Sequence, residues 1–238
     1  MDRFLARADQ LVAEGADILD VGGVKAGPGP DVEEDEELER VIPAIEVLHD
    51  RFDLPLSVDT WRSGVAREAY RAGAVVGNDI SGFADPDYLS AAAAAGASVV
   101  ATHIRLRPRV ADPHPHYDDV TTTVIDFLRD RRRRALEAGI AAERIILDAG
   151  LDLGKTAAQS LQLLRDSALI AAHGPLLLSA SNKTFLGVMF DLDVLERREA
   201  SLAAAALGIS AGCRVLRVHD VKGTVWVRDT LERVMESA

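Results

Sequence analysis

Residues 54–80, LPLSVDTWRSGVAREAYRAGAVVGNDI, contain two short apolar runs, Leu54–Thr60 and Ala74–Ile80, and each run closes on polar residues. Runs of this length and composition are typical of buried parallel strands. Five more runs of the same kind occur along the chain: Ala16–Gly23, Ser98–His103, Arg144–Gly150, Pro175–Ser181 and Arg214–Asp220. The sequence therefore predicts seven strands.

Segments with apolar residues at helical spacing lie between these runs. Four of them are clear: the segment that carries Leu38, Val41, Ile42, Ile45 and Leu48 on one face, and residues 87–95, 120–136 and 192–207. Alternating strands and helices imply parallel strands joined by right-handed crossovers. We therefore predict an α/β fold, a TIM (β/α)₈ barrel in which seven strands are recognisable.

The chain opens on a helical pattern, with Leu5, Ala8, Leu11 and Val12 on one face and Gly15 as its end. A closed barrel of this type has eight strands, and a sheet of seven would leave two open edges. We therefore expect the first strand to be missing or truncated, and the natural start to lie upstream of Met1.

Composition narrows the class of protein. A chain of 238 residues with 48% hydrophobic content suits one barrel domain, residues 1–238. A formal net charge of -11 disfavours nucleic acid and anionic membrane surfaces as partners. The single cysteine, Cys213, excludes an internal disulfide, and no apolar stretch reaches the ~18 residues that span a bilayer. We expect a cytoplasmic protein.

Two glycine-containing stretches could indicate other functions, but neither has the full motif that such a function requires. A Rossmann or flavodoxin-like sheet would carry a dinucleotide or phosphate fingerprint after its first strand, and the stretch from Gly22 to Gly27 lacks that spacing. Gly154-Lys155-Thr156 resembles the end of an ATPase phosphate loop, but the leading glycine is replaced by Ala149. We assign Lys155 and Thr156 to the start of a barrel helix.

Polar side chains close almost every predicted strand. In order they are Asp20, Asp59 with Thr60, Asn78 with Asp79, His103, Asp148, Ser181 with Lys183, and Arg217 with His219 and Asp220. The active site of a (β/α)₈ barrel lies at the carboxyl ends of its strands. The sequence thus predicts a polar site at that edge.

Six ordered segments make the prediction specific: ADILDVGG, LSVDTWRSGVA, GNDISGFADPDY, RIILDAGLDLGKT, LLLSASNKTFLG and RVLRVHDV. From about residue 16 to 221 the chain resembles dihydropteroate synthase, a pterin-binding TIM barrel. The resemblance implies a transferase of folate biosynthesis that condenses 6-hydroxymethyl-7,8-dihydropterin diphosphate with p-aminobenzoate and releases diphosphate. It also implies that both small molecules are its partners and that the chain forms a homodimer.

The resemblance assigns the pterin ring to Asp59, Asn78, Asp148 and Lys183. A pterin presents adjacent N–H donors on its aminopyrimidinone edge, which a carboxylate accepts in pairs, while an amide both donates and accepts. The ammonium of Lys183 can donate to the ring carbonyl. These residue types therefore match the polar heterocycle.

The resemblance assigns the diphosphate to Arg217 and His219, which act as catalytic residues together with Lys183. Charge that builds on the leaving diphosphate has to be stabilised, and a guanidinium and an imidazole both donate to it. Mg²⁺ is expected as the cofactor that accompanies the diphosphate. The family's asparagine ligand would precede Met1, so we expect no metal ligand within this sequence.

Several departures concern the condensation itself. The loop Gly22–Gly29, GGVKAGPG, carries Ala26 and Gly27 where the family has Thr and Arg. On the p-aminobenzoate side, formed by Ser181, Thr184 and Leu153, the leucine replaces a phenylalanine, which weakens stacking on a benzoate ring. Asp152 replaces a glycine and Asn182 an arginine.

Three hypotheses follow from the resemblance and these departures. The first is a dihydropteroate synthase-like transferase, which the six segments favour. The second is a catalytically impaired pterin-binding paralogue from the divergent second-copy branch, which the GGVKAGPG loop and Leu153 favour. The third is a methyltetrahydrofolate:corrinoid methyltransferase, because such enzymes share the pterin-binding barrel.

Overall fold

The computed structural model describes residues 1–27 and 29–236. Pro28, inside the GGVKAGPG loop, and residues 237 and 238, at the end of the predicted domain, lie outside the described residues. One parallel sheet runs in the order β1 to β7. Its strands are β1 Leu19–Gly22, β2 Leu56–Asp59, β3 Val76–Asp79, β4 Ser98–Thr102, β5 Ile145–Asp148, β6 Leu176–Leu178 and β7 Cys213–Leu216. All seven predicted strands are present.

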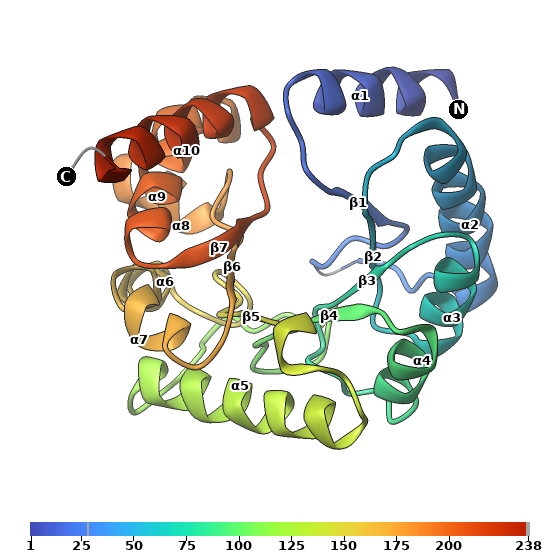
Figure 1. Cartoon of the computed structure of the whole chain (residues 1–238). Helices are drawn as coiled ribbons and strands as arrows, with labels where there is room; N and C mark the ends of the chain where they lie inside the picture. The colour runs from blue at the N-terminus through green and yellow to red at the C-terminus, as the bar shows by residue number, and fades with distance from the viewer. Residues whose placement is uncertain (28, 237–238) are drawn as a thin grey trace.

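The helices surround the sheet on its outer side, as Figure 1 shows. They are α1 Asp2–Ala13, α2 Glu34–Arg51, α3 Ser63–Arg71, α4 Tyr88–Ala95, α5 Val120–Glu137, α6 Ala157–Arg165, α7 Ser167–Ala171, α8 Thr184–Phe190, α9 Arg198–Ser210 and α10 Val221–Glu236, with 3₁₀ turns η1 Ala142–Arg144 and η2 Val194–Glu196. The fold is a curled, barrel-type array of parallel strands and helices, as predicted.

Apolar side chains fill both surfaces of the sheet. Between strands and helices, large residues such as Phe83, Tyr88 and Phe185 are fully buried. A smaller cluster of Val76, Val100 and Leu177 comes from β3, β4 and β6. Burial of such side chains contributes roughly 1.5–3 kcal/mol each and fixes the strands that carry the polar edge.

The ring is open between β7 and β1, and α10 and α1 flank the opening in Figure 1. In the described part of the chain these two strands have no ladder between them, and side chains span the gap instead. Arg7 Nη2 donates to the carbonyl of His219 at 3.0 Å, and Arg228 Nη1 lies 3.1 Å from Asp17 Oδ2. Arg217 adds a third link, described below. The opening is therefore bridged mainly by arginine side chains.

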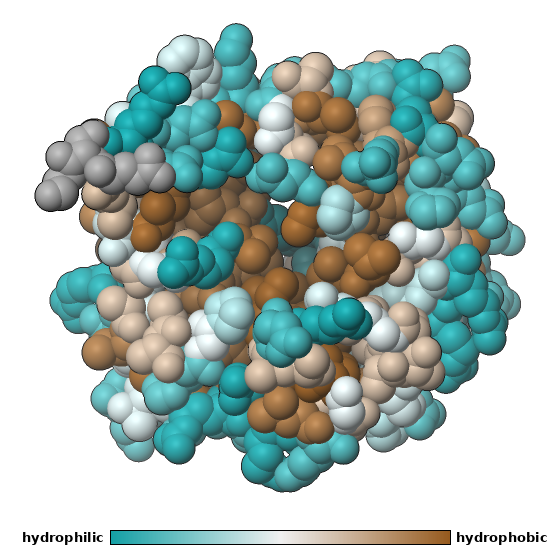
Figure 2. Space-filling model, in the orientation of Figure 1, coloured by the Kyte–Doolittle hydropathy of each residue, from teal (hydrophilic) through white to brown (hydrophobic). Residues whose placement is uncertain are grey.

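The distribution of surface hydropathy follows the ring. Figure 2 shows hydrophobic side chains gathered toward the centre of the visible face and hydrophilic ones mostly over its periphery. Within residues 1–27 and 29–236, none of the helices has the length and apolar character needed to cross a bilayer.

Candidate active site

The predicted pterin residues lie at the carboxyl edge of the sheet. Asp59 ends β2 and pairs in register with Asn78 of β3, while Asp148 ends β5 beside Thr102 of β4. Parallel strands in this register present their terminal side chains at one level. The edge therefore holds three of the four residues assigned to the ring.

The connections that follow β5, β6 and β7 supply the remaining predicted residues. Ser181 follows β6, Lys183 precedes α8 directly, and Thr184 is its first residue. Arg217 and His219 lie in the connection from β7 to α10, and Leu153 lies in the turn between β5 and α6. These connections all leave the same edge, so the set occupies one end of the ring.

A network of four side chains links the edge across the opening. Arg217 donates from Nε to Asp20 Oδ2 at 2.7 Å and from Nη2 to Asp59 Oδ2 at 2.6 Å. Asn78 Nδ2 donates to the same Asp20 oxygen at 3.3 Å. The sequence identified Asp20 as a strand-end carboxylate but gave it no role. Asp20 accepts from both Arg217 and Asn78, so it adds a second link between the predicted pterin and diphosphate groups beside the direct Arg217–Asp59 bond.

Asp59 is the most perturbed carboxyl of this network. Burial and the neighbouring Asp20 raise its pKa to about 7, partly offset by Arg217. Desolvation favours the neutral acid, whereas a nearby cation favours the carboxylate. Asp59 therefore changes protonation state near neutral pH, which is characteristic of functional positions.

Asp148 and Lys183 are neighbouring groups of opposite charge, of which Asp148 is buried and Lys183 half-buried. Burial raises the pKa of Asp148, against a backbone hydrogen bond from Gly150 and the charge of Lys183. Burial also lowers the pKa of Lys183, and Asp148 opposes that shift. Gly150 N donates to Asp148 Oδ1 at 2.8 Å, and Lys183 Nζ donates to the carbonyl of Leu151 at 3.1 Å. Both side chains are thus bonded to the same short turn.

His219 is oriented by Ser181. The backbone N–H of His219 donates to Ser181 Oγ at 3.2 Å, and its ring Nδ1 lies 3.0 Å from the same oxygen. Burial and the positive charge of Arg217 lower the pKa of His219. A cavity of about 220 Å³ opens beside the pair and is lined also by Asn182 and Arg198. His219 is therefore a hydrogen-bonding imidazole at the rim of a cavity.

The p-aminobenzoate side differs from expectation in one residue. Asp152, with a left-handed φ of 66°, accepts hydrogen bonds from the backbone of Thr184 at 2.5 Å and of Phe185 at 3.3 Å. The carboxylate thus ties the β5–α6 turn to the start of α8. Leu153 is half-buried in the same turn. From the sequence, Asp152 was noted only because it replaces a glycine of the family. In the structure it accepts hydrogen bonds from the start of α8.

Arg109 was missed by the sequence analysis. From the β4–α5 connection its Nη1 donates to the carbonyl of Lys25 at 2.7 Å, and Nη2 donates to that of Pro30. These contacts join it to the GGVKAGPG loop after β1, although β1 and β4 are not adjacent strands. No periodicity or motif marks an arginine in a long connection, so the sequence offered no signal for it.

Comparison with known proteins gives a consistent result. The family model described as "Pterin binding enzyme" matches residues 1–219. The chain is 42% identical over 236 residues to the protein named inactive dihydropteroate synthase 2 from Mycobacterium leprae, covering 96% of this chain and 80% of that relative. It is 39% identical over 225 residues to dihydropteroate synthase from Bacillus subtilis, covering 93% and 76%.

A solved structure shares the fold closely. Dihydropteroate synthase from Yersinia pestis, crystallised with a sulfonamide drug complex, superposes with a TM-score of 0.94 at 36% sequence identity. The match covers 98% of this chain and 85% of that one. Relatives with and without the qualifier "inactive" are thus similar to the chain at comparable identity.

Proposed function

Because the chain belongs to the family of pterin-binding enzymes, we propose that it is a dihydropteroate synthase-like transferase. Its substrates would be 6-hydroxymethyl-7,8-dihydropterin diphosphate and p-aminobenzoate. The observation that carries the proposal is the placement of Asp59, Asn78 and Asp148 on three strand ends with Lys183 and Arg217 beside them.

The buried carboxylates and the amide suit the pterin ring. Asp148 can accept the ring's adjacent N–H donors with both oxygens, because Oδ1 keeps a second lone pair beside the one that accepts from Gly150. Asn78 donates to Asp20, which leaves its carbonyl oxygen as an acceptor. A pocket with these fixed groups discriminates against analogues that cannot complete the hydrogen bonds, because its own polar atoms would stay unpaired.

Arg217 and His219 suit the diphosphate. In the reaction, the methylene C–O bond to diphosphate breaks as the amine of p-aminobenzoate forms the new C–N bond, so negative charge accumulates on the leaving group. Arg217 is held by Asp20 and Asp59, and it would have to turn part of its guanidinium toward the diphosphate.

Magnesium would enter as part of the diphosphate substrate. Among the described residues, no group of three or more His, Cys, Asp or Glu side chains is arranged to hold a metal ion. We expect the ion to bind with the diphosphate, and we expect catalysis in the cytoplasm.

A second candidate function has specific support. Leu153 offers no aromatic surface to a benzoate ring, and Asp152 places a carboxylate against the start of α8. An anionic benzoate near this carboxylate would be repelled. Together with the 42% identity to the Mycobacterium leprae protein, these features favour a pterin-binding protein impaired in the condensation.

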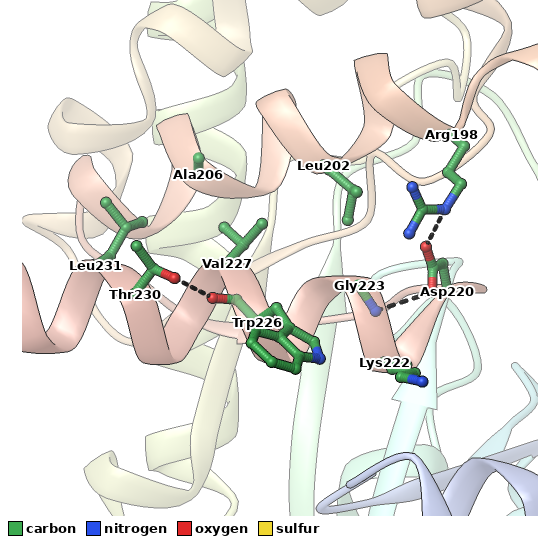
Figure 3. A pocket seen from close by; sticks show the side chains of 10 residues that line it. All are labelled: Arg198, Leu202, Ala206, Asp220, Lys222, Gly223, Trp226, Val227, Thr230 and Leu231. Carbon is green, nitrogen blue, oxygen red and sulfur yellow. Dashed lines mark hydrogen bonds and ion pairs between the residues drawn. The ribbon is translucent and has the colours of Figure 1, made fainter.

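A homodimer would use the outer face of α8 to α10. Exposed apolar side chains gather there, including Phe190, Leu195 and Trp226, the last at 68% exposure. A groove of about 640 Å³ lies between α9 and α10. Figure 3 shows its lining residues, with Trp226 on α10 and the Arg198–Asp220 ion pair at one end. A second copy of the chain would bury this apolar surface.

Trp226→Asp should yield monomers in light scattering, whereas Leu136→Asp on α5 should not.

Calorimetry separates the two candidate functions. Magnesium and the pterin diphosphate are titrated first, and p-aminobenzoate second, and product formation is measured by chromatography. Binding of both ligands with release of diphosphate identifies the transferase. Binding of the pterin diphosphate alone identifies the impaired protein, and binding of neither contradicts both candidates.

A further inference from the structure

A buried lysine contacts the turn that adjoins the candidate site. Lys155 immediately precedes Thr156, the N-cap of α6, and it is only 8% exposed. Its Nζ lies 2.9 Å from His103 Nδ1, 2.8 Å from the carbonyl oxygen of Gly150 and 3.1 Å from that of Leu153. Burial lowers the pKa of His103 to about 3 and the pKa of Lys155 to about 7, so the imidazole is neutral and accepts from the Lys155 amino group. The side chain of Lys155 is thus fully occupied.

The acceptors of Lys155 belong to the end of β4 and to the tight turn after β5. This turn, residues 150–154, is closed by a hydrogen bond from Leu153 N to the Gly150 carbonyl at 3.0 Å. Gly150 has a φ of 63°, and a Cβ there would stand 1.9 Å from the carbonyl oxygen of His103. The turn is therefore pressed against the chain that follows β4, and Lys155 donates to two of its carbonyls.

The same turn also bonds the predicted pterin groups. Its Gly150 N–H donates to Asp148 Oδ1, and its Leu151 carbonyl accepts from Lys183 Nζ. A peptide of this turn that rotated would misdirect one of these bonds. The orientation of both side chains therefore depends on the backbone that Lys155 fixes from behind.

We propose that Lys155 is a positioning residue that orients Asp148 and Lys183 through the residue 150–154 turn and so sets the affinity for the pterin ring. The inference rests on the proposed function insofar as the ligand is a pterin. Lys155 itself does not touch the ligand. Its role contrasts with the phosphate-binding role of a lysine in a Gly-Lys-Thr motif, because the amino group contacts His103 and backbone carbonyls.

The test uses Lys155→Met, which keeps the length of the side chain and removes the charge, in the full chain. The control is Thr156→Ala, which removes the neighbouring α6 cap, bonded to Gln159 N, but touches no atom of the turn. The probe is 6-hydroxymethyl-7,8-dihydropterin without diphosphate, titrated by calorimetry. In the ligand-free protein, NMR hydrogen exchange follows the Gly150 amide.

Lys155→Met should weaken probe binding about tenfold or more, the equivalent of one misdirected hydrogen bond to a charged group. It should also accelerate Gly150 exchange. Thr156→Ala should lower the melting temperature but leave the probe affinity and the Gly150 exchange rate unchanged. For the milder variant Lys155→Gln, both values should lie between those of the wild type and Lys155→Met. Unchanged affinity in the lysine variants, or an equal loss in Thr156→Ala, overturns the proposal.

If the proposed function is wrong, the same experiment gives a different result. If the wild-type chain does not bind the probe, the pterin assignment is wrong. The positioning of Asp148 is then decided by exchange alone: faster Gly150 exchange in Lys155→Met supports it, and unchanged exchange overturns it.

Discussion

Arg217 Nη2 donates to Asp59 Oδ2 at 2.6 Å, joining the end of β7 to the end of β2 across the open side of the ring. The same guanidinium binds Asp20 on β1, so one side chain links three strands. Arg217 is also the residue best suited to a diphosphate. Its structural and binding roles therefore compete for the same five N–H donors.

Replacement of Arg217 should separate these roles. Arg217→Met leaves Asp20 and Asp59 facing each other without a cation, and we expect the free energy of unfolding at pH 8 to fall by roughly 1–2 kcal/mol, a modest value because Arg217 is partly exposed. Affinity for the pterin diphosphate should fall more than affinity for the hydroxymethyl pterin. Urea denaturation and calorimetry measure the two effects.

Arg228→Met is the matched control for that variant. Arg228 also spans the opening and is as exposed as Arg217, at 44% against 45%, but its partner Asp17 is 81% exposed and the pair lies outside the site. We expect its unfolding free energy and pterin affinities to stay near those of the wild type. An equal loss of both ligands in Arg217→Met would contradict a role at the diphosphate.

Asp59 should make both stability and binding depend on pH. Its pKa in the folded chain is about 7, compared with an ordinary value of 3.8. Between these values the folded chain holds the proton more tightly than the unfolded chain, so the free energy of unfolding falls as pH rises through this window. Pterin affinity should change in the opposite direction, because only the carboxylate accepts two N–H groups.

Asp59→Asn tests the sign of this effect. The free energy of unfolding of the variant minus that of the wild type should be larger at pH 8 than at pH 5. The variant should also lose most of its pterin affinity at pH 8. Urea denaturation and calorimetry at the two pH values measure this, with Asp118→Asn as a fully exposed control. A stability difference of the opposite sign would show that Asp59 is ionised well below neutral pH.

The strands of this fold were predictable because each is a short apolar run that must be buried. The helix pattern over residues 192–207 was only partly correct. It is divided into η2 and α9, because Asp193 and Glu196 cap the 3₁₀ turn reciprocally and Arg197 binds the Leu192 carbonyl. Side-chain to backbone bonds of this kind leave apolar periodicity unchanged, so the pattern could not reveal the break.

The residues at the candidate site were predictable by type, but their partners were not. A polar residue that ends a strand of a parallel barrel faces the carboxyl edge, which located Asp59, Asn78 and Asp148. The partners of Arg217 lie 197 and 158 residues away in sequence, and nothing local encodes that pairing. Lys155 was correctly placed at a helix start, yet its burial against His103 depends on how two turns pack.

Asp152 should contribute to stability through α8. Asp152→Ala removes the acceptor for the Thr184 and Phe185 amides and leaves a less tolerant residue at a φ of 66°. We expect the free energy of unfolding to fall by about 1–3 kcal/mol. Asp152→Gly suits the left-handed backbone and isolates the lost hydrogen bonds. Wild-type stability in both variants, measured by urea denaturation, would show that these bonds contribute nothing.

Leu153 should limit affinity for p-aminobenzoate. An aromatic side chain at this position in the β5–α6 turn would offer a face to the benzoate ring, and aromatic pairs contribute about 0.5–1.5 kcal/mol beyond simple burial. Leu153→Phe should therefore bind p-aminobenzoate roughly 2- to 12-fold more tightly in the presence of magnesium and pterin diphosphate. Calorimetry on the preformed complex measures this change.

Leu153→Met supplies the control, because methionine is apolar and similar in volume to leucine but has no ring. Its affinity for p-aminobenzoate should equal that of the wild type, while the pterin affinity of both variants stays constant because Asp148 and Lys183 bind the backbone of this turn. If Leu153→Phe gains no more than Leu153→Met, the side chain does not face the benzoate. The weakness of that subsite would then lie with Asp152, whose carboxylate stands against the start of α8.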